Sequence, residues 1–164
     1  MPKVGDALLR YFPVMISTVY LGIGSNSGDR AALIGRAVAL VAMRLPVLAV
    51  RTSSFYRSEP WGFESENDFL NIVVALRYER SEAWSVGEAE ALLDSLQEIE
   101  REISSMPHRN ADGTYRDREI DIDIIGIDGR HFATDRLEVP HPRAHMRDFV
   151  TVPLGELTNI NLIS

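Results

Sequence analysis

Hydrophobic and polar residues follow one another along this chain with periods that predict six regular elements. Residues 19–23 are apolar, β-branched or aromatic, which is typical of a buried strand. Residues 29–45 carry apolar side chains at helical spacing, and Ser27 and Asp29 are both suitable caps for the start of this helix. Residues 47–56 form a second predicted strand, with alternating side chains on its two faces.

The second half of the chain adds a strand, a helix and a strand. Residues 69–78 return to strand character, and Ser85 and Glu88 match a capping box that opens a long amphipathic helix. Residues 120–125 place aspartate between isoleucines, the pattern of a strand with one polar face. The polar stretches 57–68 and 104–117 are predicted loops, and the segment from residue 129 onward is a tail without a predicted element.

The order strand, helix, strand, strand, helix, strand predicts the fold class α+β. It is the order of the ferredoxin-like βαββαβ core, an antiparallel sheet with both helices packed on one face. A chain of 164 residues suits one domain, which we expect over residues 17–164, with residues 1–16 as an N-terminal extension. The apolar run from Val14 to Gly24 is too short to span a bilayer. This fold hosts many activities, so the function must be argued from a site.

Composition and charge narrow the classes of function. The formal net charge is −7, which argues against a protein that grips long nucleic acid but leaves room for a single nucleotide. The chain has no cysteine, which excludes disulfides, thiolate metal sites and cysteine nucleophiles. We therefore expect a cytoplasmic protein without nucleic-acid or membrane partners.

Asp121 and Asp123 form the first candidate site. Side chains two residues apart on a strand point to the same face, with Cα atoms roughly 6–7 Å apart. Two carboxylates at this spacing suit Mg²⁺ ions that take their remaining ligands from water and phosphate. The alternative is a solvated strand face, because charge with a period of two is also what half-exposed strands show.

Arginines near the acidic pair favour a phosphorylated ligand. Five of them fall in the last third of the chain: Arg116, Arg118, Arg136, Arg143 and Arg147. Guanidinium groups match phosphate oxygens, so acids among arginines suit a magnesium–triphosphate complex. Ordinary surface ion pairing remains the alternative for each single arginine.

Two motifs argue against other ligands. Residues 22–28 contain three glycines, but their spacing matches neither the dinucleotide fingerprint nor a Walker A loop. His141 and His145 are four residues apart, yet Pro142 lies between them and no third ligand is near, which disfavours zinc. A rigid loop that presents His141 and Arg143 to an anion is the simpler interpretation.

The loop from Ser58 to Asn71 suits a flat heteroaromatic ligand. Trp61, Phe63 and Phe69 offer rings for stacking, and the Asn71 amide can read the edge of a ring. The alternative is that Trp61 and Phe69 are core residues.

These motifs, in their order, resemble the 6-hydroxymethyl-7,8-dihydropterin pyrophosphokinase family of folate biosynthesis. The resemblance runs from about Val19 to Leu157. It rests on five stretches: Leu21 to Asp29, Ser53 to Tyr56, Phe69 to Asn71, Arg118 to Ile124, and Val139 to Pro142 continued by Arg147 to Phe149. It implies a ferredoxin-like fold, and transfer of diphosphate from ATP to 6-hydroxymethyl-7,8-dihydropterin with release of AMP.

The resemblance also implies roles for individual residues. Asp121 and Asp123 would bind two Mg²⁺ ions and, with Arg118, are the expected catalytic residues. The residues expected around the pterin are Ser58, Glu59, Pro60, Trp61, Phe69, Asn71 and Phe149. Those expected around ATP are Gln97, Glu100, Tyr115, Arg118, Ile124, Arg136, His141 and Arg147. We expect small-molecule substrates only, and a monomer or weak homodimer.

The sequence departs from the family after the second predicted helix. The family usually carries Gly-Arg-x-Arg there, in a mobile loop whose arginine reaches the active site, whereas here Ser104 to Arg109 follows a different pattern. Arg109 and Arg116 are the candidate replacements. This leaves three rivals: a nucleotidyltransferase, a non-catalytic RNA-binding module of the same topology, and a family member that binds both substrates but turns over poorly.

Overall fold

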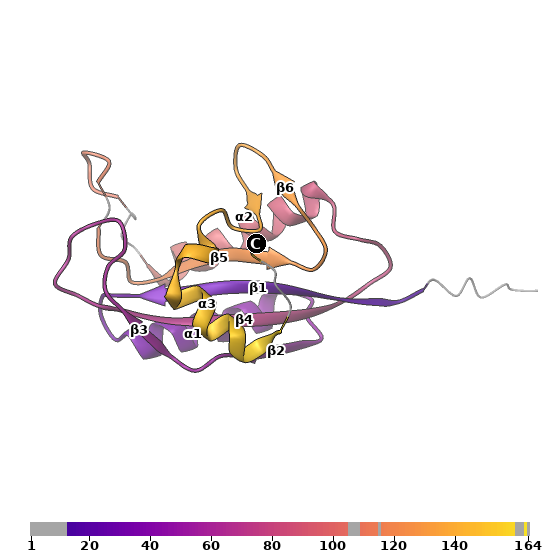
Figure 1. Ribbon diagram of the computed structural model, residues 1–164, viewed down its shortest axis with the longest axis horizontal. Helices are drawn as coiled ribbons and strands as arrows, with labels where there is room; N and C mark the ends of the chain where they lie inside the picture. Colours follow the sequence, from indigo (N-terminus) through magenta and orange to yellow (C-terminus); the bar gives the residue numbers. More distant parts are fainter. Residues whose placement is uncertain (1–12, 105–108, 115, 160–162, 164) are drawn as a thin grey trace, which may run out of the picture.

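One antiparallel sheet organises the protein. The computed structural model describes residues 13–104, 109–114, 116–159 and 163, and Figure 1 shows their arrangement. Its strands are β1 (Met15–Ser25), β2 (Ala49–Thr52), β3 (Tyr56–Ser58), β4 (Phe69–Arg80) and β5 (Asp121–Ile127). The order across the sheet is β2-β4-β1-β5, and β3 pairs with β4 beyond the end of β2. This order confirms the predicted ferredoxin-like arrangement.

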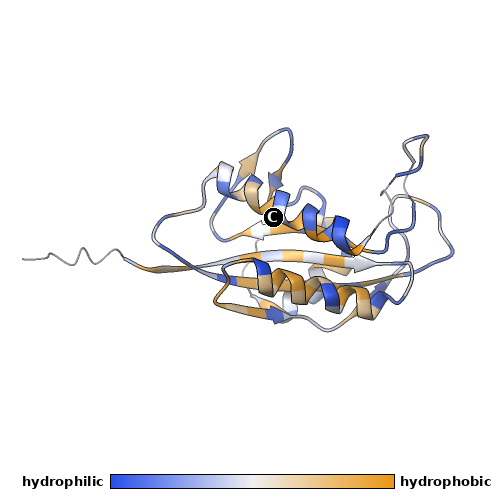
Figure 2. Cartoon of the chain, turned by 180° about the vertical axis from the view of Figure 1, so that it is seen from behind, coloured by the Kyte–Doolittle hydropathy of each residue, from blue (hydrophilic) through white to orange (hydrophobic). Residues whose placement is uncertain are grey.

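Two helices cover one face of the sheet. They are α1 (Arg30–Arg44) and α2 (Val86–Ile103), which lie side by side, and Figure 2 shows hydrophobic and hydrophilic residues alternating along both. Of the two candidate caps for α1, Asp29 fills the role, since its Oδ1 accepts a hydrogen bond from the Ala32 amide at 3.1 Å. The capping box predicted for α2 at Ser85 and Glu88 is confirmed.

The opposite face carries a third helix, α3 (Asp148–Leu157), seen in yellow in front of the sheet in Figure 1. Val150 and Leu154 of α3 pack on Tyr20, Val73 and Ile125 in a second, smaller core. The sequence pattern predicted no element here, because α3 is short and Pro153 lies inside it. The same tail contains the hairpin of β6 (Phe132–Ala133) and β7 (Glu138–Val139) and the 3₁₀ turn η1 (Ala144–Met146).

The single strand predicted over residues 47–56 is two strands in the structure. The break falls at Ser53, whose Oγ accepts a hydrogen bond from the Val73 amide at 2.9 Å while its own amide donates to the Val73 carbonyl at 2.9 Å. A side chain thus takes the place of a backbone acceptor. The chain then resumes pairing with β4 at Tyr56, as β3.

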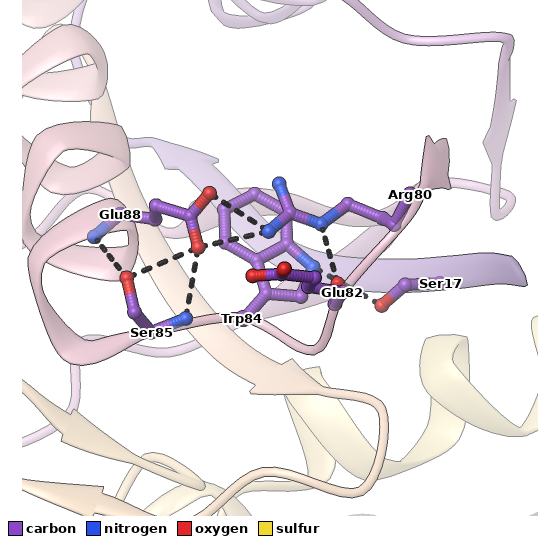
Figure 3. A network of polar contacts seen from close by, with 6 residues as sticks. All are labelled: Ser17, Arg80, Glu82, Trp84, Ser85 and Glu88. Carbon is purple, nitrogen blue, oxygen red and sulfur yellow. Dashed lines mark hydrogen bonds and ion pairs between the residues drawn. The ribbon is translucent and has the colours of Figure 1, made fainter. Parts of the chain in front are cut away.

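A polar network ties the N-terminus of α2 to one end of the sheet. The members of this Arg80 cluster, drawn in Figure 3, are Ser17, Arg80, Glu82, Trp84, Ser85 and Glu88. Trp84 is buried, donates to Ser17 Oγ at 3.1 Å, and carries the Arg80 guanidinium 4.4 Å from its ring centroid. Arg80 Nη2 also lies 2.8 Å from both carboxylate oxygens of Glu88.

The central pair of strands sets the position of the candidate site. In the register of β1 and β4, Met15 pairs with Arg80 at one end and Ser25 with Leu70 at the other. The Arg80 cluster lies at the first end, and a cavity lies at the second. No helix among the described residues is long and apolar enough to cross a membrane.

Candidate active site

A cavity of about 450 Å³ opens where β1, β4 and β5 lie side by side, on the sheet face that carries α3. Its floor is a row across the sheet, in which Gly24 pairs with Asn71 on one side and with Asp121 on the other. A Cβ atom on Gly24 would lie 2.9 Å from Asn71 Oδ1, so only glycine leaves this row uncrowded. The bare backbone of the central strand thus makes the space for a ligand.

The acidic pair stands on β5 at the edge of this floor. Asp121 pairs with Gly24 and Asp123 with Gly22, and both aspartates line the cavity. Burial raises the pKa of Asp123, and the neighbouring Asp121 carboxylate raises it further, while Arg147 and Arg118 oppose the shift. The raised pKa shows that a second negative charge beside Asp121 is disfavoured in this buried position. Two oxygen ligands in such a field fit a hard divalent cation.

Such a cation would need further ligands. Among the residues that the structure describes, no group of three histidine, cysteine, aspartate or glutamate side chains is placed to hold a metal ion. Water and phosphate oxygens are the usual completion of a two-carboxylate magnesium site. The donor set therefore fits a metal that arrives with a phosphorylated ligand.

Two arginines adjoin the pair. Arg118 Nη1 donates to Asp121 Oδ2 at 2.6 Å. The Arg147 guanidinium lies over the rings of Trp61, at 4.6 Å from the centroid, and Phe149, at 5.5 Å. Burial lowers the pKa of Arg147, and its buried Nε has no hydrogen-bond partner within the described part of the chain. Arg147 thus offers a donor to an anion in the cavity.

His141 is held neutral at the same wall. Burial and the nearby Arg147 charge lower the pKa of His141 to about 4. Its Nδ1 accepts a hydrogen bond from the Arg143 amide at 3.2 Å, which places the remaining ring proton on Nε2. His141 can therefore donate to a ligand without adding charge.

The other half of the cavity is aromatic. Asn71 Nδ2 donates to Ser58 Oγ at 2.9 Å and to the Tyr56 carbonyl at 3.0 Å, which fixes the amide plane at the cavity floor. Phe69 contacts Phe63 edge to face, with ring centroids 6.1 Å apart. Phe149 reaches the same space from the start of α3. An amide beside aromatic rings suits a flat heteroaromatic ligand.

Most of the residues named from the sequence line this cavity. They are Ser58, Glu59, Trp61, Phe69, Asn71, Arg118, Asp121, Asp123, His141, Arg147 and Phe149. Pro60, Gln97, Glu100, Ile124 and Arg136 are not among its lining residues. Tyr115 lies outside the described residues.

Three residues expected around the nucleotide are occupied elsewhere. Ile124 is buried in the core that faces α1 and α2. Arg136 forms an ion pair with Asp94 at the surface. Glu100 lies on α2, where its Oε1 accepts a hydrogen bond from the Ile122 amide at 2.5 Å, between the two aspartates in sequence.

Glu100 is buried close to the acidic pair. Burial and the Asp121 charge raise its pKa to about 8, while the hydrogen bond from Ile122 opposes the shift. The side chain thus holds the β5 backbone from the helical side of the sheet.

Several lining residues were not predicted as site residues from the sequence, including Gly22, Gly24, Ile125 and Val150. Glycines two apart within a strand are a signal for close approach to the backbone, and could have identified the first two. Of the candidate replacements for the loop arginine, Arg109 donates to the Gly113 carbonyl within its own turn, at 2.8 Å. Arg116 is half-buried beside Asp117.

The fold and cavity define a class: an α+β protein whose cavity sets an acidic pair and arginines beside an amide and aromatic rings. Residues 20–159 match the family model for 7,8-dihydro-6-hydroxymethylpterin-pyrophosphokinase. The chain belongs to this family.

Curated relatives agree with that assignment. A 2-amino-4-hydroxy-6-hydroxymethyldihydropteridine pyrophosphokinase of Porphyromonas gingivalis is 41% identical over 147 residues, covering 87% of this chain and 91% of the relative. The enzyme of that name from Bacillus subtilis is 34% identical over 143 residues, covering 87% and 79%. That from Aquifex aeolicus is 36% identical over 142 residues, covering 87% and 81%.

Proposed function

We propose that the cavity on β1, β4 and β5 is where this enzyme transfers diphosphate from ATP to 6-hydroxymethyl-7,8-dihydropterin. The reaction itself follows from the family, since the chain is a pyrophosphokinase, a transferase of folate biosynthesis. The observation that supports the location is one cavity with two unlike halves. The acidic pair and its arginines form one half, and the Asn71 amide with aromatic rings forms the other.

The charged half would bind the nucleotide. Asp121 and Asp123 would hold two Mg²⁺ ions, which offset phosphate charge and align the chain of phosphates. Arg118 and Arg147 would donate to phosphate oxygens, and neutral His141 would add a further donor. A bound cation would favour the ionised form of Asp123, whose pKa is raised by burial and by the neighbouring Asp121 carboxylate.

The aromatic half would bind the pterin. Phe69 and Phe149 would enclose its ring, Asn71 would read its edge, and the loop from Ser58 through Glu59 and Pro60 to Trp61 would close the pocket. This arrangement points the hydroxymethyl group toward the acidic pair, because Asn71 and Asp121 flank the same residue, Gly24.

The chemistry is direct displacement at phosphorus. The pterin hydroxymethyl oxygen forms a bond to the β-phosphorus, the bond from that phosphorus to the oxygen of the α-phosphate breaks, and AMP leaves. The hydroxyl proton passes to solvent. Positioning and charge stabilisation account for most of the catalysis in such transfers. Arg118 and Arg147 supply donors where negative charge accumulates.

The cellular setting belongs to the same proposal. We place the enzyme in the cytoplasm, in keeping with a sequence that has no cysteine. We expect it to act as a monomer or weak homodimer on small molecules alone.

The test is incubation with Mg-ATP, with and without the pterin, followed by separation of the nucleotides. AMP that forms only with the pterin supports the proposal. Release of pyrophosphate would instead identify a nucleotidyltransferase. Asp121→Ala should abolish metal-dependent turnover, whereas Asp135→Ala, at an exposed aspartate, should not. Near-normal turnover of Asp121→Ala would refute the assignment of the acidic pair.

A further inference from the structure

One carboxylate outside the cavity binds three segments of the chain together. Asp117 Oδ1 accepts hydrogen bonds from Asn26 Nδ2 at 2.8 Å and from Ser65 Oγ at 2.6 Å. Its Oδ2 accepts from Asn67 Nδ2 at 2.7 Å. We call these four residues the Asp117 clamp. It joins the end of β1, the loop between β3 and β4, and the segment that leads into β5.

The clamp holds Arg118 through the backbone as well. The side-chain Oδ1 of the buried Asn26 accepts a hydrogen bond from the Arg118 backbone amide at 2.7 Å. The backbone amide of Asn26 donates to the Arg118 carbonyl at 3.0 Å. Asn26 Nδ2 also lies 3.2 Å from the Asn67 carbonyl. The backbone of Arg118 is therefore held by the side-chain amide group of Asn26, the group that also donates to Asp117.

The two sides of the clamp belong to the two halves of the cavity. The loop of residues 59–68 contributes Glu59 and Trp61 to the aromatic half and leads directly into Phe69. Arg118, next to Asp117 in the chain, reaches Asp121 in the charged half. The Asp117 carboxylate thus provides hydrogen-bonded links between the two walls, beside the contact of Asn26 Nδ2 with the Asn67 carbonyl.

The carboxylate is well suited to this task. Burial raises the pKa of Asp117, but the hydrogen bonds from Ser65, Asn67 and Asn26 outweigh it, and the net shift is downward. Asp117 is thus ionised at neutral pH, and an ionised carboxylate has acceptor sites for all three donors. A neutral amide in its place would set an N–H group against at least one of them.

We propose that Asp117 is a positioning residue that couples the pterin loop to Arg118, so that occupation of one substrate site favours the binding-competent arrangement of the other. This inference rests on the proposed function, because it needs the pterin in the aromatic half and the nucleotide in the charged half. Asp117 acts through its neighbours and touches neither substrate.

A merely structural role is the alternative, and the loop does have other anchors. Arg30 Nη1 donates to the Asp68 carbonyl at 2.8 Å, and Arg57 Nε lies 2.7 Å from Asp68 Oδ2. These contacts hold the end of the loop at β4 and do not involve Arg118. A purely structural Asp117 would affect both binding sites alike, whereas coupling is a property of the pair of sites.

The experiment compares pterin affinity with and without nucleotide. The probes are 6-hydroxymethyl-7,8-dihydropterin and magnesium α,β-methylene-ATP, in which the bond to be broken is blocked. For the wild-type enzyme we expect the nucleotide to tighten pterin binding by at least about 5-fold. The coupling ratio is the Kd of the pterin without nucleotide divided by its Kd with nucleotide. In Asp117→Asn this ratio should fall to within about 2-fold of one, while Asp112→Asn should keep the wild-type ratio.

Asp112 is a matched control for charge and location. It is exposed and lies in the same connection between α2 and β5. Its Oδ1 accepts hydrogen bonds from the Thr114 amide at 2.9 Å and from the Thr114 hydroxyl at 2.6 Å. Asp112→Asn therefore makes the same change of charge without touching either wall of the cavity.

Ser65→Ala cuts the same link from the pterin side and guards against a variant that fails to fold. It should lower the ratio on its own, and Asp117→Asn combined with it should lower the ratio no further than Asp117→Asn alone. The inference would be overturned if the nucleotide did not tighten pterin binding to the wild-type enzyme. It would also be overturned if Asp117→Asn and Ser65→Ala both kept the same ratio as the wild type. Failure of the proposed function is distinct, since the wild-type enzyme would then form no AMP with the natural substrates.

Discussion

The Arg80 cluster and the acidic pair lie toward opposite ends of the sheet, the first on β1, β4 and the start of α2 and the second on β5, and both combine carboxylates with arginines. In the Arg80 cluster, Arg80 faces both oxygens of Glu88 and lies over Trp84 (Figure 3). Hydrogen bonds from Ser85 and Arg80 lower the pKa of Glu88. At the other end, burial and a neighbouring carboxylate raise the pKa of Asp123.

The difference separates charges that complete the fold from charges that await a ligand. The Arg80 cluster satisfies its own groups, so it stabilises the protein and has nothing to offer a substrate. The charge of Asp123 is unfavourable in the protein alone, which is a common property of functional sites, and under the proposed function a cation and phosphate would offset this cost. The two ends are therefore distinguished by the direction of the pKa shift of their carboxylates, downward for Glu88 and upward for Asp123, better than by residue type.

Asp123→Asn should have the largest effect, because it should change activity and stability in opposite directions. Turnover should fall by about 100-fold or more, because a charged ligand of the cation is lost. The free energy of unfolding at pH 8 without metal should nevertheless rise by about 1 kcal/mol, since the amide removes a buried charge beside Asp121. Initial rates and urea titrations in EDTA measure the two effects. Equal losses of activity and stability would contradict this account, and Asp135→Asn serves as the control.

Glu100→Gln should have a smaller effect, confined to the pH dependence of stability. Burial raises the pKa of Glu100 from its ordinary value of 4.5 to about 8 in the folded state, so the folded protein retains a proton that the unfolded chain loses between these values. The stabilisation from this proton is complete below pH 4.5 and is lost as the pH rises through 8.

Glutamine has no such loss, so its stability relative to the wild type should increase from pH 5 to pH 9, by about 1–3 kcal/mol. The measurement is urea unfolding at several pH values in EDTA, because a bound cation would favour the ionised carboxylate. Glu98→Gln, on the exposed side of the same helix, should run parallel to the wild type. A parallel profile for Glu100→Gln would show that Glu100 is ionised throughout.

Ser85→Ala should have the smallest effect, and it tests whether the Arg80 cluster contributes to stability alone. Loss of the cap on α2 should lower the free energy of unfolding by about 1 kcal/mol. The ratio kcat/KM should stay within about 2-fold of wild type, because the cluster and the cavity are far apart and act independently. Thermal unfolding and initial rates test both statements, with exposed Ser81→Ala as control. A large fall in kcat/KM would mean that the two ends are coupled.

The order of the elements could be predicted because its signals are local. Alternation on β5, the stripe on α2 and the capping box at Ser85 each depend on residues close in sequence. The paired aspartates and the aromatic loop were visible for the same reason. The break at Ser53 was not, since it depends on the Val73 amide twenty residues away.

The environment of single side chains was the least predictable part. The resemblance placed Glu100 around ATP, and only the folded sheet shows that its carboxylate accepts a hydrogen bond from the Ile122 amide. The Asp117 clamp likewise joins residues that are 50 and 91 positions apart. Composition and spacing contain no information about such distant pairs.

The central place of β1 in the sheet also shapes how the protein is made. β1 leaves the ribosome first, yet it pairs with β4 and then with β5, whose residues lie about one hundred positions later. Contacts between such distant segments form slowly, because a long loop must close before they contribute. A chain that has been synthesised only as far as α2 can already bury the β1–β4 ribbon, but it lacks both aspartates. Nascent chains should therefore become competent for nucleotide only after β5 has been synthesised.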